Sequence, residues 1–127
     1  MAMRCPCGTG ETYEACCGRL HEGTGVAATA EALMRSRYSA FAKGDAGYLH
    51  KTWDRATRPA SVELDGGISW RFLEIVETVA GGPLDPVGIV EFRAHYRSPS
   101  GHGERHERSR FARQNGRWVY VGAAPLG

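Results

Sequence analysis

The sequence predicts an α+β domain in which helices pack on a curved antiparallel sheet. Apolar residues recur with a helical period between residues 29 and 53, and with a period of two from residue 69 to residue 122. Helices followed by strands that can pair as a meander are typical of this class. All four cysteines precede both patterns, within the first 17 residues. That segment is therefore expected to form a short N-terminal knuckle.

Two helices are expected before the sheet. The first covers residues 31–43, with Thr29 as its N-cap and Gly44 at its end. The second covers residues 46–53 and is capped by Asp45. The segments without either period are rich in glycine, proline and polar residues and are predicted to be linkers: residues 20–28 and 54–67.

Four strands are expected after the helices, each bounded by residues that favour turns. Asn115 and Gly116 predict a type I′ turn between the last two strands. Residues 98–103 contain two glycines and a proline and are predicted to be a loop. The expected strands are residues 69–79, 87–97, 105–113 and 118–122.

Length and composition are those of one globular domain. The charged fraction of 24% is ordinary, and a net charge of +2 requires neither a nucleic acid nor an anionic membrane as partner. No stretch approaches the roughly 18 consecutive apolar residues of a membrane helix. The first residues also lack the apolar run of a signal peptide. We therefore expect a cytoplasmic protein with no membrane contact.

The cysteines favour a structural zinc site. Cα atoms of the adjacent Cys16 and Cys17 are about 3.8 Å apart, closer than the roughly 4.4–6.8 Å between bridged cysteines. Four thiolates instead suit Zn²⁺ at about 2.3 Å, and such a closed site has no open position for a substrate. Unligated thiols and a redox relay are the alternatives. The predicted zinc ligands are Cys5, Cys7, Cys16 and Cys17.

The cysteine segment resembles the SEC-C motif, a zinc-binding segment found on the protein-translocation ATPase SecA and on many other bacterial proteins. That motif reads Cys-x-Cys-Gly-Ser-Gly, then a Lys/Tyr-rich stretch, then Cys-Cys or Cys-His and Gly. All ligand positions match, with Thr9 in place of the serine and glutamates in place of usual lysines. The resemblance implies a zinc knuckle over residues 1–24, with Cys17 as the fourth ligand and His21 as a bystander.

The rest of the chain resembles the YchJ family of bacterial proteins. The resembling segments are residues 30–41, 48–53, 106–111 and 118–122. The order of helices and strands is also similar to the cone-shaped fold of nuclear transport factor 2 (NTF2) and ketosteroid isomerase. These resemblances imply an NTF2-like (cystatin-like) domain over residues 25–127. They imply no particular activity.

Cone folds of this kind hold ligands between the helices and the concave face of the sheet. Alternation places Glu107 and Ser109 on the same face as the apolar Phe111, which predicts that they point inward. An inward glutamate must be paired or protonated. Arg35 or Arg37 is the expected partner, with Tyr38 and Tyr96 nearby as hydroxyl donors. The alternative is a buried ion pair that only fixes how helix and sheet dock. The candidate pocket residues are Arg35, Tyr38, Trp53, Tyr96, Glu107 and Ser109.

Three functions agree with these features. The leading interpretation is a zinc-containing binding or adaptor protein, with a protein partner at the knuckle and a small-molecule pocket or homodimer surface in the cone. The first alternative is a small enzyme with Glu107 as general acid or base. The second is a metal-handling protein whose cysteine site exchanges its ion. Glu104 and Glu107 interrupt the arginines of the third strand, so a nucleic-acid partner is not expected.

Overall fold

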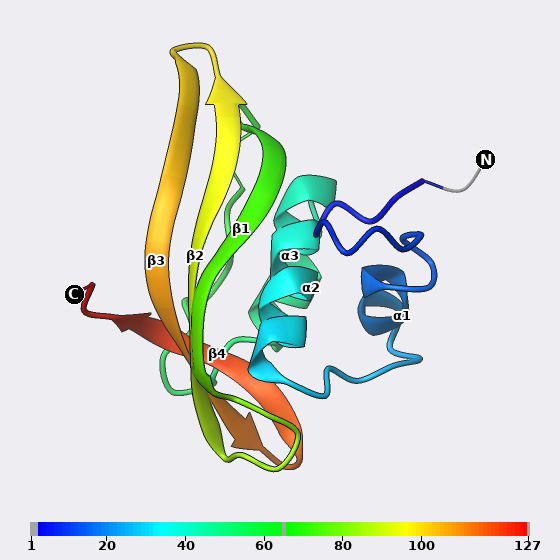
Figure 1. Ribbon diagram of the computed structural model, residues 1–127, viewed down its shortest axis with the longest axis vertical. Helices are drawn as coiled ribbons and strands as arrows, with labels where there is room; N and C mark the ends of the chain where they lie inside the picture. The colour runs from blue at the N-terminus through cyan, green and yellow to red at the C-terminus, as the bar shows by residue number, and fades with distance from the viewer. Residues whose placement is uncertain (1–2, 65, 127) are drawn as a thin grey trace.

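Figure 1 shows the computed structural model, which describes residues 3–64 and 66–126. A four-stranded antiparallel sheet forms one layer, helices cover one of its faces, and the cysteine segment lies beyond those helices. The predicted α+β class is confirmed. Residues 1–2 of the predicted knuckle, residue 65 of the predicted linker and residue 127 of the predicted domain lie outside the described residues. The elements are α1 (Cys17–Glu22), α2 (Ala30–Lys43), α3 (Ala46–Lys51), β1 (Ser69–Ala80), β2 (Val87–Ser98), β3 (Gly101–Gln114) and β4 (Arg117–Ala124).

Both predicted caps of α2 are present. The Thr29 hydroxyl accepts a hydrogen bond from the Ala32 N–H at 3.0 Å, which satisfies one of the free donors of the first turn. Gly44 ends the helix in the left-handed conformation with φ of 78°, where a residue without Cβ meets no steric penalty. Local chemistry therefore fixes both ends of the central helix.

α3 ends at Lys51, two residues before the end of the helix predicted at residues 46–53. Trp53 instead forms an isolated parallel bridge with Tyr120 of β4. The residues on either side of Trp53 make two backbone hydrogen bonds with Tyr120, both of 2.8 Å. Pairing with the sheet replaces the last helical turn and brings the Trp53 ring to 5.1 Å from the Tyr120 ring.

α1 overlaps the segment predicted as a linker, so that prediction is wrong for residues 20–22. Six residues are too few to display a helical period in the sequence. Gly23 ends the helix with φ of 86°. Leu20 packs against the buried clusters on both sides of α2, so tertiary contacts stabilise a helix that would not persist alone.

The β2–β3 connection is shorter than the loop predicted at residues 98–103. The two strands pair up to Ser98 and Gly101, leaving a two-residue turn. Gly103 lies opposite Tyr96, and a Cβ there would lie 2.6 Å from the tyrosine ring. The glycine marks a close approach inside a strand rather than a loop. The type I′ turn is confirmed, with φ of 54° at Asn115 and 78° at Gly116.

The main core lies between α2 and the concave face of the sheet. Alternation along β2 and β3 buries one side of each strand, and register shifts with extra residues in β1 and β4 bend the sheet around the helix. Phe111 and Trp118 contribute buried rings from the sheet, at 1% and 2% exposure. The core residues from the helix and strands include Leu33, Met34, Tyr38, Val90, Phe92 and Ala94.

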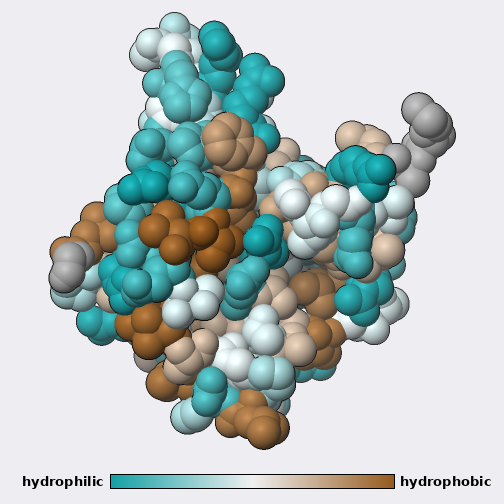
Figure 2. Space-filling model, viewed as in Figure 1, coloured by the Kyte–Doolittle hydropathy of each residue, from teal (hydrophilic) through white to brown (hydrophobic). Residues whose placement is uncertain are grey.

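The β2–β3 hairpin projects beyond the helices, and hydrophilic side chains gather over its tip (Figures 1 and 2). The convex face of the sheet exposes several apolar side chains, namely Phe72, Val76, Val79 and Val87. Across residues 3–64 and 66–126, no helix has the length and apolar character needed to cross a membrane.

Candidate metal centre and cone pocket

The four predicted zinc ligands converge on one point. Their sulfur atoms all lie within 4.8 Å of one another. The Sγ atoms of Cys7 and Cys16 are 3.6 Å apart, and those of Cys16 and Cys17 are 4.0 Å apart. Sulfurs at about 2.3 Å from a tetrahedral ion would be about 3.8 Å apart, whereas a disulfide requires about 2.05 Å. The cluster is therefore spaced to hold a metal ion and not to form a bridge.

Two backbone turns bring the cysteine pairs together. In the first, the Gly8 N–H donates to the Cys5 carbonyl at 3.2 Å, and Gly8 has φ of 89°, which favours glycine. In the second, the Tyr13 carbonyl accepts from the N–H groups of Cys16 and Gly18, at 3.1 and 2.7 Å. A Cβ on Gly18 would lie 2.6 Å from that carbonyl oxygen. Glycine is therefore required where the second cysteine pair enters α1.

Without a cation, negative charge is favoured at one of the sulfurs, that of Cys7, whereas burial raises the pKa of Cys16. A hydrogen bond from the Cys17 thiol lowers the pKa of Cys7 to about 4, and the same contact raises the pKa of Cys17. The Thr9 hydroxyl lies 3.2 Å from the sulfur of Cys16, and the Ser39 hydroxyl of α2 lies 3.4 Å from that of Cys5. Hydroxyls at these distances can donate to thiolates and stabilise them when a cation is bound.

Arg35, predicted for the pocket, lies on the knuckle side of α2. Its Nη1 donates to the Cys7 carbonyl at 2.7 Å, and its Nε pairs with Glu31 at 2.9 Å. Each helical residue advances about 100° around the axis, which turns Arg35 well away from the pocket stripe that includes Met34 and Tyr38. Arg35 is excluded from the cavity because another face of α2 is turned toward the sheet. The sequence alone does not reveal which face that is.

His21 is a structural bridge between the knuckle and α2. Its Nε2 donates to the Ser36 carbonyl at 2.8 Å, and its Nδ1 accepts from the Tyr13 hydroxyl at 2.6 Å. Its ring also lies 4.5 Å from the ring of Tyr48. Both ring nitrogens are engaged in these bonds, and the metal-ligand group contains only the four cysteines.

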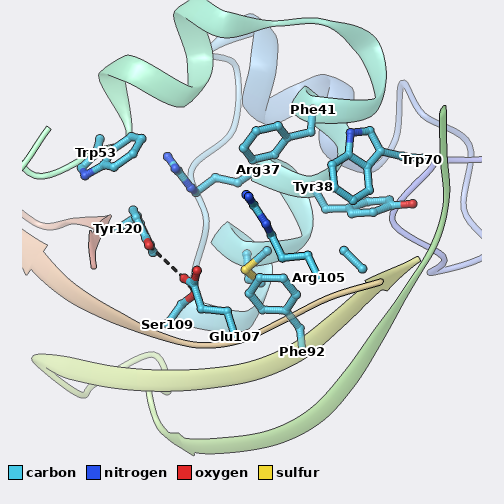
Figure 3. A pocket seen from close by; sticks show the side chains of 12 residues that line it. Arg37, Tyr38, Phe41, Trp53, Trp70, Phe92, Arg105, Glu107, Ser109 and Tyr120 are labelled. Atoms are coloured by element: carbon cyan, nitrogen blue, oxygen red, sulfur yellow. Dashed lines mark hydrogen bonds between the residues drawn. The ribbon is translucent and has the colours of Figure 1, made fainter. Parts of the chain in front are cut away.

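A cavity of about 100 Å³ opens between α2 and the sheet (Figure 3). Four of the six predicted pocket residues line it, namely Tyr38, Trp53, Glu107 and Ser109. Tyr96 lines an adjoining hollow of about 290 Å³ that shares Phe41, Trp70 and Arg105 with the first. The β2–β3 hairpin extends beyond the helix, so Tyr96 lies too far along the strand to reach the inner cavity.

Glu107 is held by hydroxyl groups instead of the predicted arginine. Its Oε2 accepts hydrogen bonds from Ser109 at 2.6 Å and from Tyr120 at 2.8 Å. Burial is the main cause that raises the pKa of Tyr120, so its hydroxyl remains a donor. In the described part of the chain, Glu107 forms no ion pair with Arg35 or Arg37. The prediction of an arginine partner is therefore wrong.

Arg37 enters the cavity from α2 with a buried guanidinium, at 4% residue exposure. Its Nη1 donates to the Leu49 carbonyl at 2.8 Å and to the Thr52 hydroxyl at 2.7 Å. The guanidinium carbon lies 4.7 Å from the Tyr120 ring centre and 5.3 Å from that of Trp53. Burial lowers the pKa of Arg37 to about 10, so the group is still a cation at neutral pH.

Arg105 and Tyr120 line the cavity but were not among the pocket residues predicted from the sequence. Arg105 has the same parity on β3 as Glu107, so alternation alone would have placed it on the inner face. Tyr120 required knowledge of the register, because a shift between Arg110 and Phe111 sets which β4 residue lies opposite.

An NTF2-like α+β domain with an N-terminal four-cysteine knuckle is the class of protein that this fold and site define. The family model "YchJ, middle NTF2-like domain" matches residues 29–123, and the "SEC-C motif" model matches residues 4–19. The chain belongs to the YchJ family, and the curated relatives described below carry the designation UPF0225.

Two curated relatives match over nearly their whole length. UPF0225 protein SCO1677 of Streptomyces coelicolor is 57% identical over 117 residues, which cover 92% of this chain and 91% of the relative. UPF0225 protein Cgl1438/cg1626 of Corynebacterium glutamicum is 53% identical over 120 residues, covering 94% and 95%.

Two solved structures share the arrangement. The solution structure of RPA3114, a SEC-C motif containing protein from Rhodopseudomonas palustris, has a TM-score of 0.84 and 34% identity, covering 98% of this chain and 100% of that one. The crystal structure of a SEC-C motif containing protein from Psychrobacter arcticus has a TM-score of 0.75 and 28% identity, covering 97% and 84%. The similarity thus includes the knuckle as well as the cone.

Proposed function

We propose that this protein is a zinc-stabilised binding module. The knuckle, residues 1–24, holds one Zn²⁺ through four thiolates, and the cone, residues 25–127, binds a small molecule. The observation that carries the proposal is that α2 serves both sites. One face of α2 meets the knuckle through Arg35 and Ser39, and the opposite face lines the cavity through Arg37 and Tyr38. The knuckle therefore supports a wall of the pocket.

Zinc is the ion that best suits the donor set. Four thiolates with tetrahedral spacing are typical of structural zinc sites. Cys5, Cys7 and Cys17 are buried, and only Cys16 is partly exposed. A closed, mostly buried set of four sulfurs leaves no position for a substrate, which supports a structural role for the ion.

The two sides of the knuckle differ in what they can bind. Its inner side is occupied by α2, whereas its rim exposes charges of both signs, from Arg4, Glu11, Glu14 and Arg19. A protein partner at the knuckle stays a prediction, and this charged rim is the surface left for it. The enzyme alternative has less support, because the Ser109 and Tyr120 hydroxyls both donate to the same oxygen of Glu107, and these two bonds make that oxygen a weaker base.

The test of this function is zinc exchange. We expect the native protein to contain one zinc per chain and to retain it for hours in a colorimetric chelator of micromolar affinity, because release requires opening the knuckle. Denaturant should release the ion at once, which provides the control for total zinc. Complete transfer to the chelator within minutes under native conditions would instead support the metal-handling alternative.

A further inference from the structure

The cone pocket contains a buried guanidinium, that of Arg37, which lies in the field of Glu107 but forms no direct ion pair with any described residue. Arg37 is almost completely buried, and across residues 3–64 and 66–126 its only hydrogen-bond acceptors are the neutral oxygens of Leu49 and Thr52. Removing a cation from water is costly unless an opposite charge accompanies it. The rings of Trp53 and Tyr120 offset part of this cost through cation–π contact. An anion that enters the cavity would offset the remaining cost of burying the Arg37 cation.

A second guanidinium faces the same space from the sheet. Arg105 of β3 lines both the inner cavity and the adjoining hollow, and Figure 3 shows its side chain directed toward the space occupied by Arg37. In the described structure the guanidinium of Arg105 has no hydrogen-bond or ion-pair partner, whereas that of Arg108 on the convex face pairs with Glu77 and Glu91. Arg105 is exposed and lies at the mouth of the pocket.

The pocket charges define the charge of the ligand. Arg37 and Arg105 contribute two positive charges, and Glu107 contributes one negative charge whose Oε2 is already bonded by Ser109 and Tyr120. The excess is one positive charge, which a monoanion neutralises. A second negative charge on the ligand would meet the Glu107 carboxylate and be repelled. This favours a carboxylate over a phosphate monoester, which carries about two charges at neutral pH.

The walls define the shape of the ligand. Flat aromatic rings surround the charged groups, from Phe41, Trp53, Trp70 and Phe92. The inner cavity of about 100 Å³ is small beside the roughly 300–1,000 Å³ of pockets that hold drug-sized ligands. A planar carboxylate matches the fork of a guanidinium, and a planar apolar body matches the rings.

We propose that the cone pocket binds a small planar aromatic carboxylate, with its anionic group at Arg37 and Arg105 and its ring between the aromatic walls. This inference rests on the proposed ligand-binding function. It adds the chemical class of the ligand, which the binding proposal leaves open.

The test uses benzoate and its neutral isostere benzamide, titrated into the full-length zinc-loaded protein and followed by the backbone amide signals of the pocket residues. We expect benzoate to bind at least tenfold more tightly than benzamide. Arg105→Gln should weaken benzoate binding about tenfold and leave benzamide unchanged, because an exposed arginine can be replaced without disturbing the core. Glu107→Gln should tighten benzoate binding, since it removes the like charge.

Two controls separate the possible failures. Arg110→Gln removes an exposed charge from the same strand outside the cavity and should change nothing. Ala94→Leu fills the cavity and should abolish binding of both probes. If benzamide binds as tightly as benzoate and Arg105→Gln has no effect, the anion assignment is wrong while the binding function stands. A weakly binding fragment should perturb the pocket signals at a probe concentration of about 10 mM. If neither benzoate nor benzamide does so, the anion assignment and the ligand-binding function are both overturned.

Discussion

Replacing Cys7 by serine should abolish zinc binding and lower the melting temperature by at least about 10 °C, which corresponds to roughly 3 kcal/mol for a chain of this size. Cys7 has no exposed surface and lies at the centre of the sulfur cluster. A segment of about twenty residues cannot fold without the metal, so the contacts of Cys5 and Arg35 across the interface with α2 would also be lost.

The measurement combines zinc content by elemental analysis with thermal unfolding followed by circular dichroism. Thr9→Ser is the matched control, because it keeps the hydroxyl that lies 3.2 Å from the sulfur of Cys16 and should keep both zinc and stability. A Cys7→Ser protein with full zinc content and an unchanged melting temperature would refute the role of this residue.

Phe111→Ala should lower the free energy of unfolding by about 3–5 kcal/mol, as is usual for removing a fully buried phenylalanine ring. Phe111 is 1% exposed and packs in the core between α2 and the sheet, with the Tyr120 ring 5.8 Å away. Loss of the ring would leave a void beside Tyr120, which lines the pocket. The free energy of unfolding in urea measures the effect.

Phe72→Ala is the matched control on the convex face of the same sheet. Phe72 is 53% exposed and stacks on His95 with ring centres 4.1 Å apart, so its removal should cost below about 1 kcal/mol. If Phe111→Ala and Phe72→Ala lowered the free energy of unfolding equally, the concave face would not be the core of the domain.

Local chemistry was enough to predict most of the fold. Thr29 and Gly44 bound α2 because an N-cap hydroxyl and a left-handed glycine act within one turn. Gly101 and Gly103 led to the prediction of a loop where the structure has a strand. Glycine occurs both in turns and where two backbones or side chains approach closely, and only the tertiary structure distinguishes these two cases. Gly103 makes room for the Tyr96 ring on the neighbouring strand, which is a long-range contact.

The two sites differed in how far the sequence could predict them. The cysteine cluster is local, so spacing and the resemblance to the SEC-C motif were sufficient to propose its four ligands. The pocket is assembled from α2, β3 and β4, and its members depend on helix phase and strand register. Glu107 followed from alternation alone, whereas Arg37 and Tyr120 required knowing which helix face and which β4 residue lie opposite it.

The most direct test of the metal centre is X-ray absorption at the zinc edge on protein purified under reducing conditions. We expect one zinc per chain with a single shell of four sulfurs at about 2.3 Å, supplied by Cys5, Cys7, Cys16 and Cys17. A metal-free protein that takes up no zinc on addition, or a shell in which nitrogen or oxygen replaces one of the sulfurs, would contradict it.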